Sequence, residues 1–114
     1  MKILSPTQHG YLDYLTVVIF LLAPAIIGLT GLAGTIAYLL AAIHLAMTLV
    51  TDFPLGVVKK LPFAIHGWVE RVVGPVLVLL PFALGFEGTA LGFYIVIGII
   101  IILVGLLTDY QRTL

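Results

Sequence analysis

The sequence predicts an all-α fold: an integral membrane four-helix bundle made of two parallel tandem helical-hairpin repeats. Of the 114 residues, 62% are hydrophobic and only 9% are charged, whereas about a quarter of the residues of a soluble domain are charged. The apolar residues gather in four long stretches. The second half of the chain also aligns with the first without a gap, which indicates two copies of one structural unit.

Each apolar stretch is close to the length of a membrane-spanning helix, which needs roughly 20 residues to cross a hydrocarbon core of about 30 Å. The third stretch is the shortest, but a helix from Pro62 to Gly85 reaches full length if Glu70 and Arg71 lie near its end. The alternation of apolar and polar residues typical of transmembrane strands is not visible. We therefore expect four spanning helices in a single membrane domain, residues 1–114. The stretches cover approximately residues 12–29, 32–51, 72–86 and 89–107.

Sequence signals mark where the first and third helices begin. Ser5, followed three residues later by Gln8, predicts a capping box, and Pro6 suits the first helical position. Pro62 can open the third helix in the same way. Glycine follows both of these helices, as expected at two tight hairpin turns.

The two halves match at a shift of 57 residues, so residues 1–57 and 58–114 are predicted to be copies of one helical hairpin. Because each copy has two spans, the second copy enters the membrane from the same side as the first. The copies are then parallel repeats related by a pseudo-twofold axis along the membrane normal. The matching pairs include His9/His66, Gly10/Gly67, Asp13/Glu70, Pro24/Pro81, Gly28/Gly85, Gly31/Gly88, Thr51/Thr108, Asp52/Asp109 and Phe53/Tyr110.

The first helix could be mistaken for a secretory signal peptide, because Lys2 precedes an apolar run that reaches Ala-Pro-Ala at 23–25. The corresponding segment around Pro81 lies inside the chain. We therefore expect the first helix to be a structural part of the protein.

All basic residues are expected on one side of the membrane, because the two hairpin turns contain none. Basic residues are enriched in cytoplasmic loops. Both termini and the central loop are therefore predicted to face the cytoplasm. The five basic residues are Lys2, Lys59, Lys60, Arg71 and Arg112.

Composition excludes several function classes. The absence of cysteine excludes disulfides, thiolate metal sites and c-type haem attachment. The formal net charge is zero and there is no basic tract, so nucleic acid is not an expected partner. The expected partner is the lipid bilayer. Four short helices enclose too little space for a transport pathway, so a transporter would have to be a homo-oligomer, and this alternative stays open. Since no nucleophile–base arrangement is visible, we do not expect an enzyme.

The few ionisable residues inside the helices recur in both halves of the chain. The stretch HGYLD, from His9 to Asp13, is matched by HGWVE, from His66 to Glu70. In each stretch the histidine and the acid are four residues apart and share a helix face. Ionisable groups in a membrane are unfavourable by roughly 2.5–3.5 kcal/mol each on insertion scales, so they are candidates for function.

Further polar residues near the same side complete the candidate site. His44 shares a stripe of the second helix with polar residues at its end, whereas the equivalent position 101 is Ile. Counting the helical rise of about 1.5 Å per residue, we expect two layers of candidate ligands. The outer layer would contain His9, His66, Asp52 and Asp109, and the inner layer Asp13, Glu70 and His44. The supporting polar residues would be Thr48, Thr51 and Thr108.

Three interpretations of this cluster stay open. Histidine and carboxylate on facing helices are typical of metal sites in helical bundles, and the same groups could relay protons. Haem b could be held between His9 and His66 as a symmetric pair. Alternatively the cluster is purely structural: the carboxylates bind other polar side chains across the helices, and the protein is an assembly subunit without a ligand.

Each half also shows an acid near the helix start, an apolar run, and then LAPAIIGLTG or LLPFALGFEG. This pattern resembles the SPW-repeat family of small bacterial membrane proteins, in which proline and a downstream glycine end the first helix of a two-helix repeat. The Ser-Pro-Trp of the family corresponds to Ala-Pro-Ala at 23–25 and Leu-Pro-Phe at 80–82. The resemblance implies the two-helix repeat fold and a bacterial cytoplasmic membrane, and it implies no particular activity.

Overall fold

The computed structural model describes residues 2–111, and within them the regular structure is four long helices and one short strand pair. All four helices are long and apolar enough to cross a membrane, which indicates a multi-pass membrane protein. The predicted all-α membrane fold is thereby confirmed. The elements are α1 (Pro6–Ile27), α2 (Gly31–Val50), β1 (Thr51–Asp52), β2 (Leu61–Pro62), α3 (Phe63–Leu84) and α4 (Gly88–Leu107).

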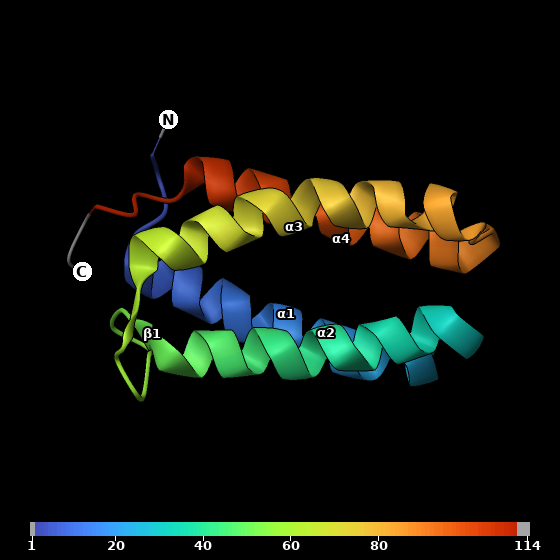
Figure 1. The fold of residues 1–114 in the computed structure, drawn as a ribbon, viewed down its shortest axis with the longest axis horizontal. Helices are drawn as coiled ribbons and strands as arrows, with labels where there is room; N and C mark the ends of the chain where they lie inside the picture. The colour runs from blue at the N-terminus through green and yellow to red at the C-terminus, as the bar shows by residue number, and fades with distance from the viewer. Residues whose placement is uncertain (1, 112–114) are drawn as a thin grey trace.

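The helices form two hairpins, α1 with α2 and α3 with α4 (Figure 1). Buried side chains of both hairpins meet in one apolar core. The described ends of the chain and the loop with β1 and β2 lie at one end of the helices, here called the loop end. The two tight turns lie at the opposite end, here called the turn end. The molecule measures 41 × 27 × 19 Å, so its long axis fits helices of about 30 Å.

The ends of the helices follow from local sequence. The capping box is confirmed, since Ser5 N donates to Gln8 Oε1 at 2.9 Å and Gln8 N donates to Ser5 Oγ at 3.2 Å. Pro62 is the N-cap of α3 and not its first helical residue, because it belongs to β2 and pairs with Asp52. Gly28 and Gly85 end α1 and α3 with φ of 72° and 71°, a left-handed conformation that favours glycine.

Each helix of the second half begins and ends 57 residues after its counterpart in the first half. The main-chain pairing between the halves follows the same shift. Thr51 pairs in parallel with Leu61, and Leu4 pairs in parallel with Thr108. Two halves that share one set of element boundaries agree with the predicted repeat, while their origin by duplication stays a prediction.

The apolar core lies between the two hairpins. Tyr94 of α4 is fully buried in it, and its hydroxyl donates to the Ala33 carbonyl oxygen of α2 at 2.6 Å. This bond ties one hairpin to the other away from the candidate site. The buried apolar cluster consists of Phe20, Ala23, Leu29, Ala33, Ala37, Ala41, Leu77, Tyr94, Ile97 and Ile101.

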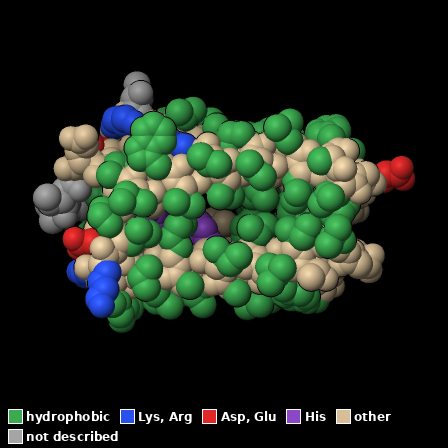
Figure 2. Space-filling model, in the orientation of Figure 1, with side chains coloured by type: hydrophobic (Ala, Val, Ile, Leu, Met, Phe, Trp, Pro, Cys, Tyr) green, Lys and Arg blue, Asp and Glu red, His purple; other side chains and the backbone are tan. Residues whose placement is uncertain are grey.

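The outer surface of the helices is covered by large apolar side chains, as expected for a surface that faces lipid (Figure 2). The basic side chains visible in that view gather at the loop end. Arg112 lies outside the described residues. Which side of a membrane the loop end faces stays a prediction.

Candidate metal centre

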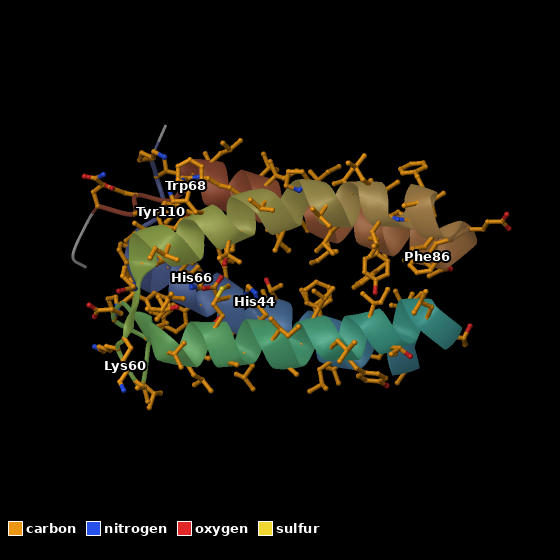
Figure 3. The ribbon with its side chains drawn as sticks, viewed as in Figure 1. His44, Lys60, His66, Trp68, Phe86 and Tyr110 are labelled. Atoms are coloured by element: carbon orange, nitrogen blue, oxygen red, sulfur yellow. The ribbon has the colours of Figure 1, made fainter. Side chains whose placement is uncertain are left out.

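Four ionisable side chains meet in the core near the loop end: His9 and Asp13 from α1, and His66 and Glu70 from α3. They are here called the His–carboxylate cluster. Both histidines are fully buried and both acids are 3% exposed. One ligand atom from each of the four residues lies within 4.8 Å of the others, so the group could hold a metal ion. Figure 3 shows His66 pointing into the space between the hairpins.

Each imidazole Nε2 in the cluster approaches both carboxylates. His9 Nε2 lies 3.1 Å from Asp13 Oδ1 and 3.2 Å from Glu70 Oε2. His66 Nε2 lies 3.0 Å from Asp13 Oδ2 and 2.6 Å from Glu70 Oε1. The four groups therefore form a closed ring in which nitrogen and oxygen alternate.

Hydrogen bonds within the ring reach only one of the two acids. Glu70 Oε1 is within hydrogen-bonding distance and direction of both histidines, at 2.6 Å from His66 Nε2 and 3.3 Å from His9 Nε2. Asp13 Oδ2 is buried and accepts no hydrogen bond, although His66 Nε2 is close to it. A buried carboxylate oxygen without a hydrogen-bond donor is unfavourable unless a positive charge is nearby.

Two threonines hold the far side of the histidine rings. Thr108 Oγ1 lies 2.8 Å from His9 Nδ1, and Thr51 Oγ1 lies 2.7 Å from His66 Nδ1. Each hydroxyl donates its single proton to a carbonyl oxygen of its own chain segment, at 2.6 Å in both cases. Each threonine oxygen therefore accepts a hydrogen bond from Nδ1–H, which leaves Nε2 of each ring to face the carboxylates.

This pattern of hydrogen bonds determines what the cluster needs at its centre. If both histidines were neutral, the lone pairs of their Nε2 atoms would point at two negative carboxylates. Two protons, one on each Nε2, would neutralise the two carboxylate charges, and so would one divalent cation. The threonine contacts match the outer-sphere hydrogen bonds that fix the orientation of histidines bound to metals.

The spacing of the four groups suits a small metal ion. In a tetrahedral zinc site with bonds of about 2.0–2.1 Å, neighbouring ligand atoms are about 3.3 Å apart. Neighbouring atoms of the ring lie 2.6–3.2 Å apart. One ligand atom from each of the four residues lies within 4.8 Å of the others, so tetrahedral coordination would need the contacting atoms to move slightly apart and any opposite atoms to move closer.

A haem between His9 and His66 does not fit the described residues. The two imidazole ring centroids are 5.3 Å apart, and the two carboxylates occupy the space between the Nε2 atoms. The cavity beside the cluster has a volume of about 50 Å³, whereas pockets for drug-sized ligands begin near about 300 Å³.

The two predicted outer-layer aspartates do not join the cluster, and that prediction is wrong. Asp52 is exposed, and Asp109 is half-buried and accepts a hydrogen bond from Gln111 N at 3.1 Å. The helices end at Val50 and Leu107, and the next residue of each chain segment is extended. Because side chains alternate along extended backbone, the threonines point inward and the aspartates point outward.

The prediction of two separate layers is also wrong, since His9, Asp13, His66 and Glu70 lie together. Side chains on a helix tilt toward its N-terminus. The acid at position i+4 therefore reaches back to the level of the histidine at position i. A count of helical rise along the backbone overlooks this tilt.

Thr48 and His44 lie beside the cluster. Thr48 is fully buried, but its hydroxyl donates to the His44 carbonyl oxygen of its own helix at 2.8 Å. His44 Nε2 lies 3.5 Å from Asp13 Oδ1 and has no hydrogen-bond partner. Figure 3 places His44 near the cluster from the α2 side.

Aromatic rings close the loop end of the cluster, a feature that the sequence did not reveal. Phe63 and Tyr110 pack on the edge of the His9 ring, with centroids 5.2 Å and 5.5 Å away, and Phe53 lies 5.9 Å from the His66 ring. Burial, with a smaller effect of the Glu70 carboxylate, raises the pKa of Tyr110 above its ordinary range, so its phenol is neutral. The pairing of Phe53 with Tyr110 at the 57-residue shift was the available signal.

No protein-family model, curated protein or solved structure matches this chain. The resemblance to the SPW-repeat family therefore stays a prediction, and function has to be inferred from the geometry of the His–carboxylate cluster.

Proposed function

We propose that this membrane protein binds one divalent transition-metal ion through His9, Asp13, His66 and Glu70. The observation that supports this most directly is the closed ring, in which each Nε2 lies within 3.2 Å of both carboxylates. Imidazole and carboxylate ligands without thiolate suit Zn²⁺, Fe²⁺ or Mn²⁺. The two carboxylate charges balance a divalent ion. None of the four side chains is placed as a nucleophile, so we propose binding and not catalysis.

We further infer that the cluster lies at the centre of two parallel tandem repeats. The bonds His9–Thr108 and His66–Thr51 convert into each other under the 57-residue shift, with lengths of 2.8 Å and 2.7 Å. A pseudo-twofold axis between α1 and α3 would relate them. By the distribution of basic residues, the loop end would face the cytoplasm, so the site would lie in the cytoplasmic half of a bacterial inner membrane.

A structural role without a ligand is the second candidate. It is favoured by the bond of 2.6 Å between His66 Nε2 and Glu70 Oε1, which is short enough for a charge-assisted hydrogen bond. In that case two protons would occupy the cluster in place of the metal. The cluster would then serve only to join α1 to α3.

Elemental analysis of protein purified in mild detergent without chelators tests the two candidates. We expect about one divalent metal atom per chain, or uptake of one Zn²⁺ on dialysis, with loss of binding in Asp13→Asn and Glu70→Gln. The matched controls are Asp52→Asn and Asp109→Asn, which change the same groups outside the cluster and should keep the metal. A folded wild-type protein that neither contains nor takes up metal would refute the metal site and favour the structural role.

A further inference from the structure

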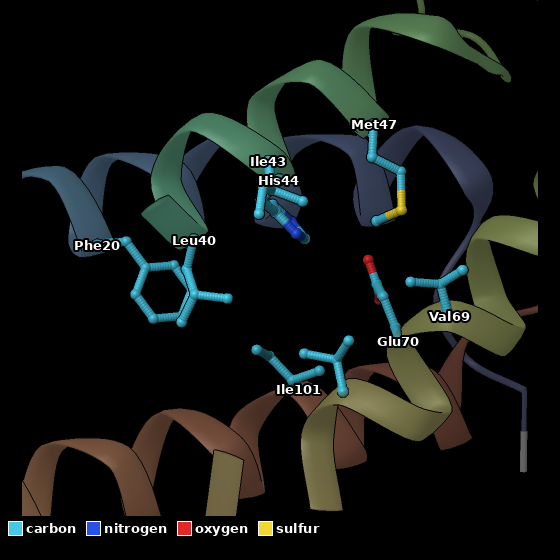
Figure 4. Close-up of a pocket in the computed structure, with 9 residues that line it drawn as sticks. Phe20, Leu40, Ile43, His44, Met47, Val69, Glu70 and Ile101 are labelled. Atoms are coloured by element: carbon cyan, nitrogen blue, oxygen red, sulfur yellow. The ribbon is translucent and has the colours of Figure 1, made fainter. Parts of the chain in front are cut away.

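A small cavity lies against the His–carboxylate cluster on the side of α2 and α3 (Figure 4). Its volume is about 50 Å³. Glu70 of the cluster and His44 line it, and the other lining side chains are apolar. These come from all four helices and include Phe20, Leu40, Met47, Val73 and Ile101. In Figure 2 histidine atoms are visible in the hollow between the two hairpins. His9 and His66 are fully buried, whereas the His44 side chain is 12% exposed.

His44 makes the cluster asymmetric. Its equivalent at the 57-residue shift is Ile101, which lines the same cavity. The Nε2 atom of His44 is buried and has no hydrogen-bond partner, and it lies 3.5 Å from Asp13 Oδ1. His44 does not belong to the set of ligand atoms that lie within 4.8 Å of one another. An atom in the cavity, beside the 3.5 Å contact with Asp13, would give His44 Nε2 the hydrogen-bond partner that it lacks among the described residues.

The size and polarity of the cavity limit what that atom can belong to. A water molecule has a share of liquid volume of about 30 Å³ and needs two to four polar partners. A cavity of about 50 Å³ therefore has room for a molecule of that size, and His44 and Glu70 line it as two polar partners. A bound anion would add a charge that the metal and its two carboxylates do not balance, in apolar surroundings that disfavour it.

Building on the metal site proposed above, we propose that this cavity holds one water molecule, bound to the metal as a fifth ligand and hydrogen-bonded to His44 Nε2. His44 is then a positioning residue that acts on the metal through the water. Five-coordinate zinc is known from catalytic sites, which expand from four ligands during the reaction. The protein ligands come symmetrically from α1 and α3, and the water enters only from the α2–α3 side, where His44 stands.

Cobalt-substituted protein tests this proposal. Wild-type protein and His44→Ile, which places at position 44 the residue found at position 101, are loaded with Co²⁺ and their bound metal is counted. Visible absorption then reports coordination number, since four-coordinate Co²⁺ absorbs severalfold more strongly than five-coordinate Co²⁺. Pulsed EPR in water enriched in ¹⁷O reports whether a water oxygen is bound to the metal.

We expect wild-type protein to show five-coordinate Co²⁺ with ¹⁷O coupling, and His44→Ile to keep one Co²⁺ per chain in a four-coordinate site without that coupling. Four-coordinate Co²⁺ in the wild type would overturn the proposal, and so would five-coordinate Co²⁺ without ¹⁷O coupling, because His44 would then be a direct ligand. Five-coordinate, ¹⁷O-coupled Co²⁺ in both proteins would show that His44 does not hold the water. If the wild type binds no Co²⁺, the metal site itself is refuted, which is a separate result. The wild-type measurement stands even if His44→Ile does not fold.

Discussion

At the scale of single residues, the orientation of the two histidine rings depends on the hydrogen-bonding groups of the neighbouring side chains. Thr51 and Thr108 each use their only proton within their own chain segment, so each presents a lone pair to a histidine. A serine could make the same bonds, but valine, which has the same shape, could not. The two threonines therefore set the direction in which the imidazole rings face, and this defines a direct test.

Replacement of Thr108 or Thr51 by valine should weaken metal binding about 10–100-fold, the usual cost of losing a partner of a metal-bound histidine. The measurement is a competition titration with a chelator of known affinity. Thr48→Val is the matched control, since Thr48 is equally buried but bonds only within its own helix. Equal affinities for all three variants and the wild type would contradict the role given to the threonines.

At the scale of elements, the segment that follows each hairpin closes the cluster by packing on a glycine in the first helix of the same hairpin. Gly10 faces Phe53 and Leu55, and Gly67 faces Tyr110. The glycine next to each histidine in the repeated HG pair thus leaves room for an aromatic ring above the site. The sequence showed this glycine twice and matched Phe53 with Tyr110 at the same shift, but it did not show that these rings pack on the two glycines.

Gly67→Ala should lower the free energy of unfolding by about 1–3 kcal/mol, the usual cost of overpacking a buried contact. A Cβ atom at position 67 would lie 2.6 Å from Tyr110 Cε1, so the ring would have to move. Gly92→Ala is the control, because a Cβ there meets nothing within 4 Å and alanine favours a helix. Thermal unfolding in detergent compares the two variants, and an equal loss in both would speak against the packing argument.

At the scale of the whole molecule, the two hairpins are joined by a few specific polar contacts across an apolar core. The cluster joins α1 to α3 near the loop end, and the Tyr94–Ala33 bond joins α4 to α2 deeper in the bundle. Helices in lipid associate through close packing and such hydrogen bonds, since the lipid is as apolar as their side chains. A metal ion at the cluster would therefore act as a clamp between the hairpins.

Metal should raise the stability of the whole bundle. A ligand that binds only the folded state contributes about 2.7 kcal/mol when its concentration is a hundred times its dissociation constant. We expect the unfolding temperature in detergent to rise on adding Zn²⁺ to metal-free protein and to fall again with excess chelator. Asp13→Asn should unfold at a temperature independent of Zn²⁺. A response of this variant as large as that of the wild type would place the stabilising metal at another site.

The sequence by itself determined those features that depend on composition and on short-range chemistry. Four apolar stretches of spanning length, the capping box at Ser5 and the 57-residue shift all reappear in the helix boundaries. The pairs His9/Asp13 and His66/Glu70 could be placed on one face each because helical periodicity is a local property.

Only the tertiary structure decided which of the polar side chains meet. Asp52 and Thr51 are adjacent in sequence, and the point where α2 ends determines which of them faces the core. That His9, Asp13, His66 and Glu70 meet in one layer depends on the tilt of side chains from two different helices. The cavity beside His44 depends on the space left between all four helices. These features arise from contacts between segments far apart along the chain, and a pattern within one segment carries no information about them.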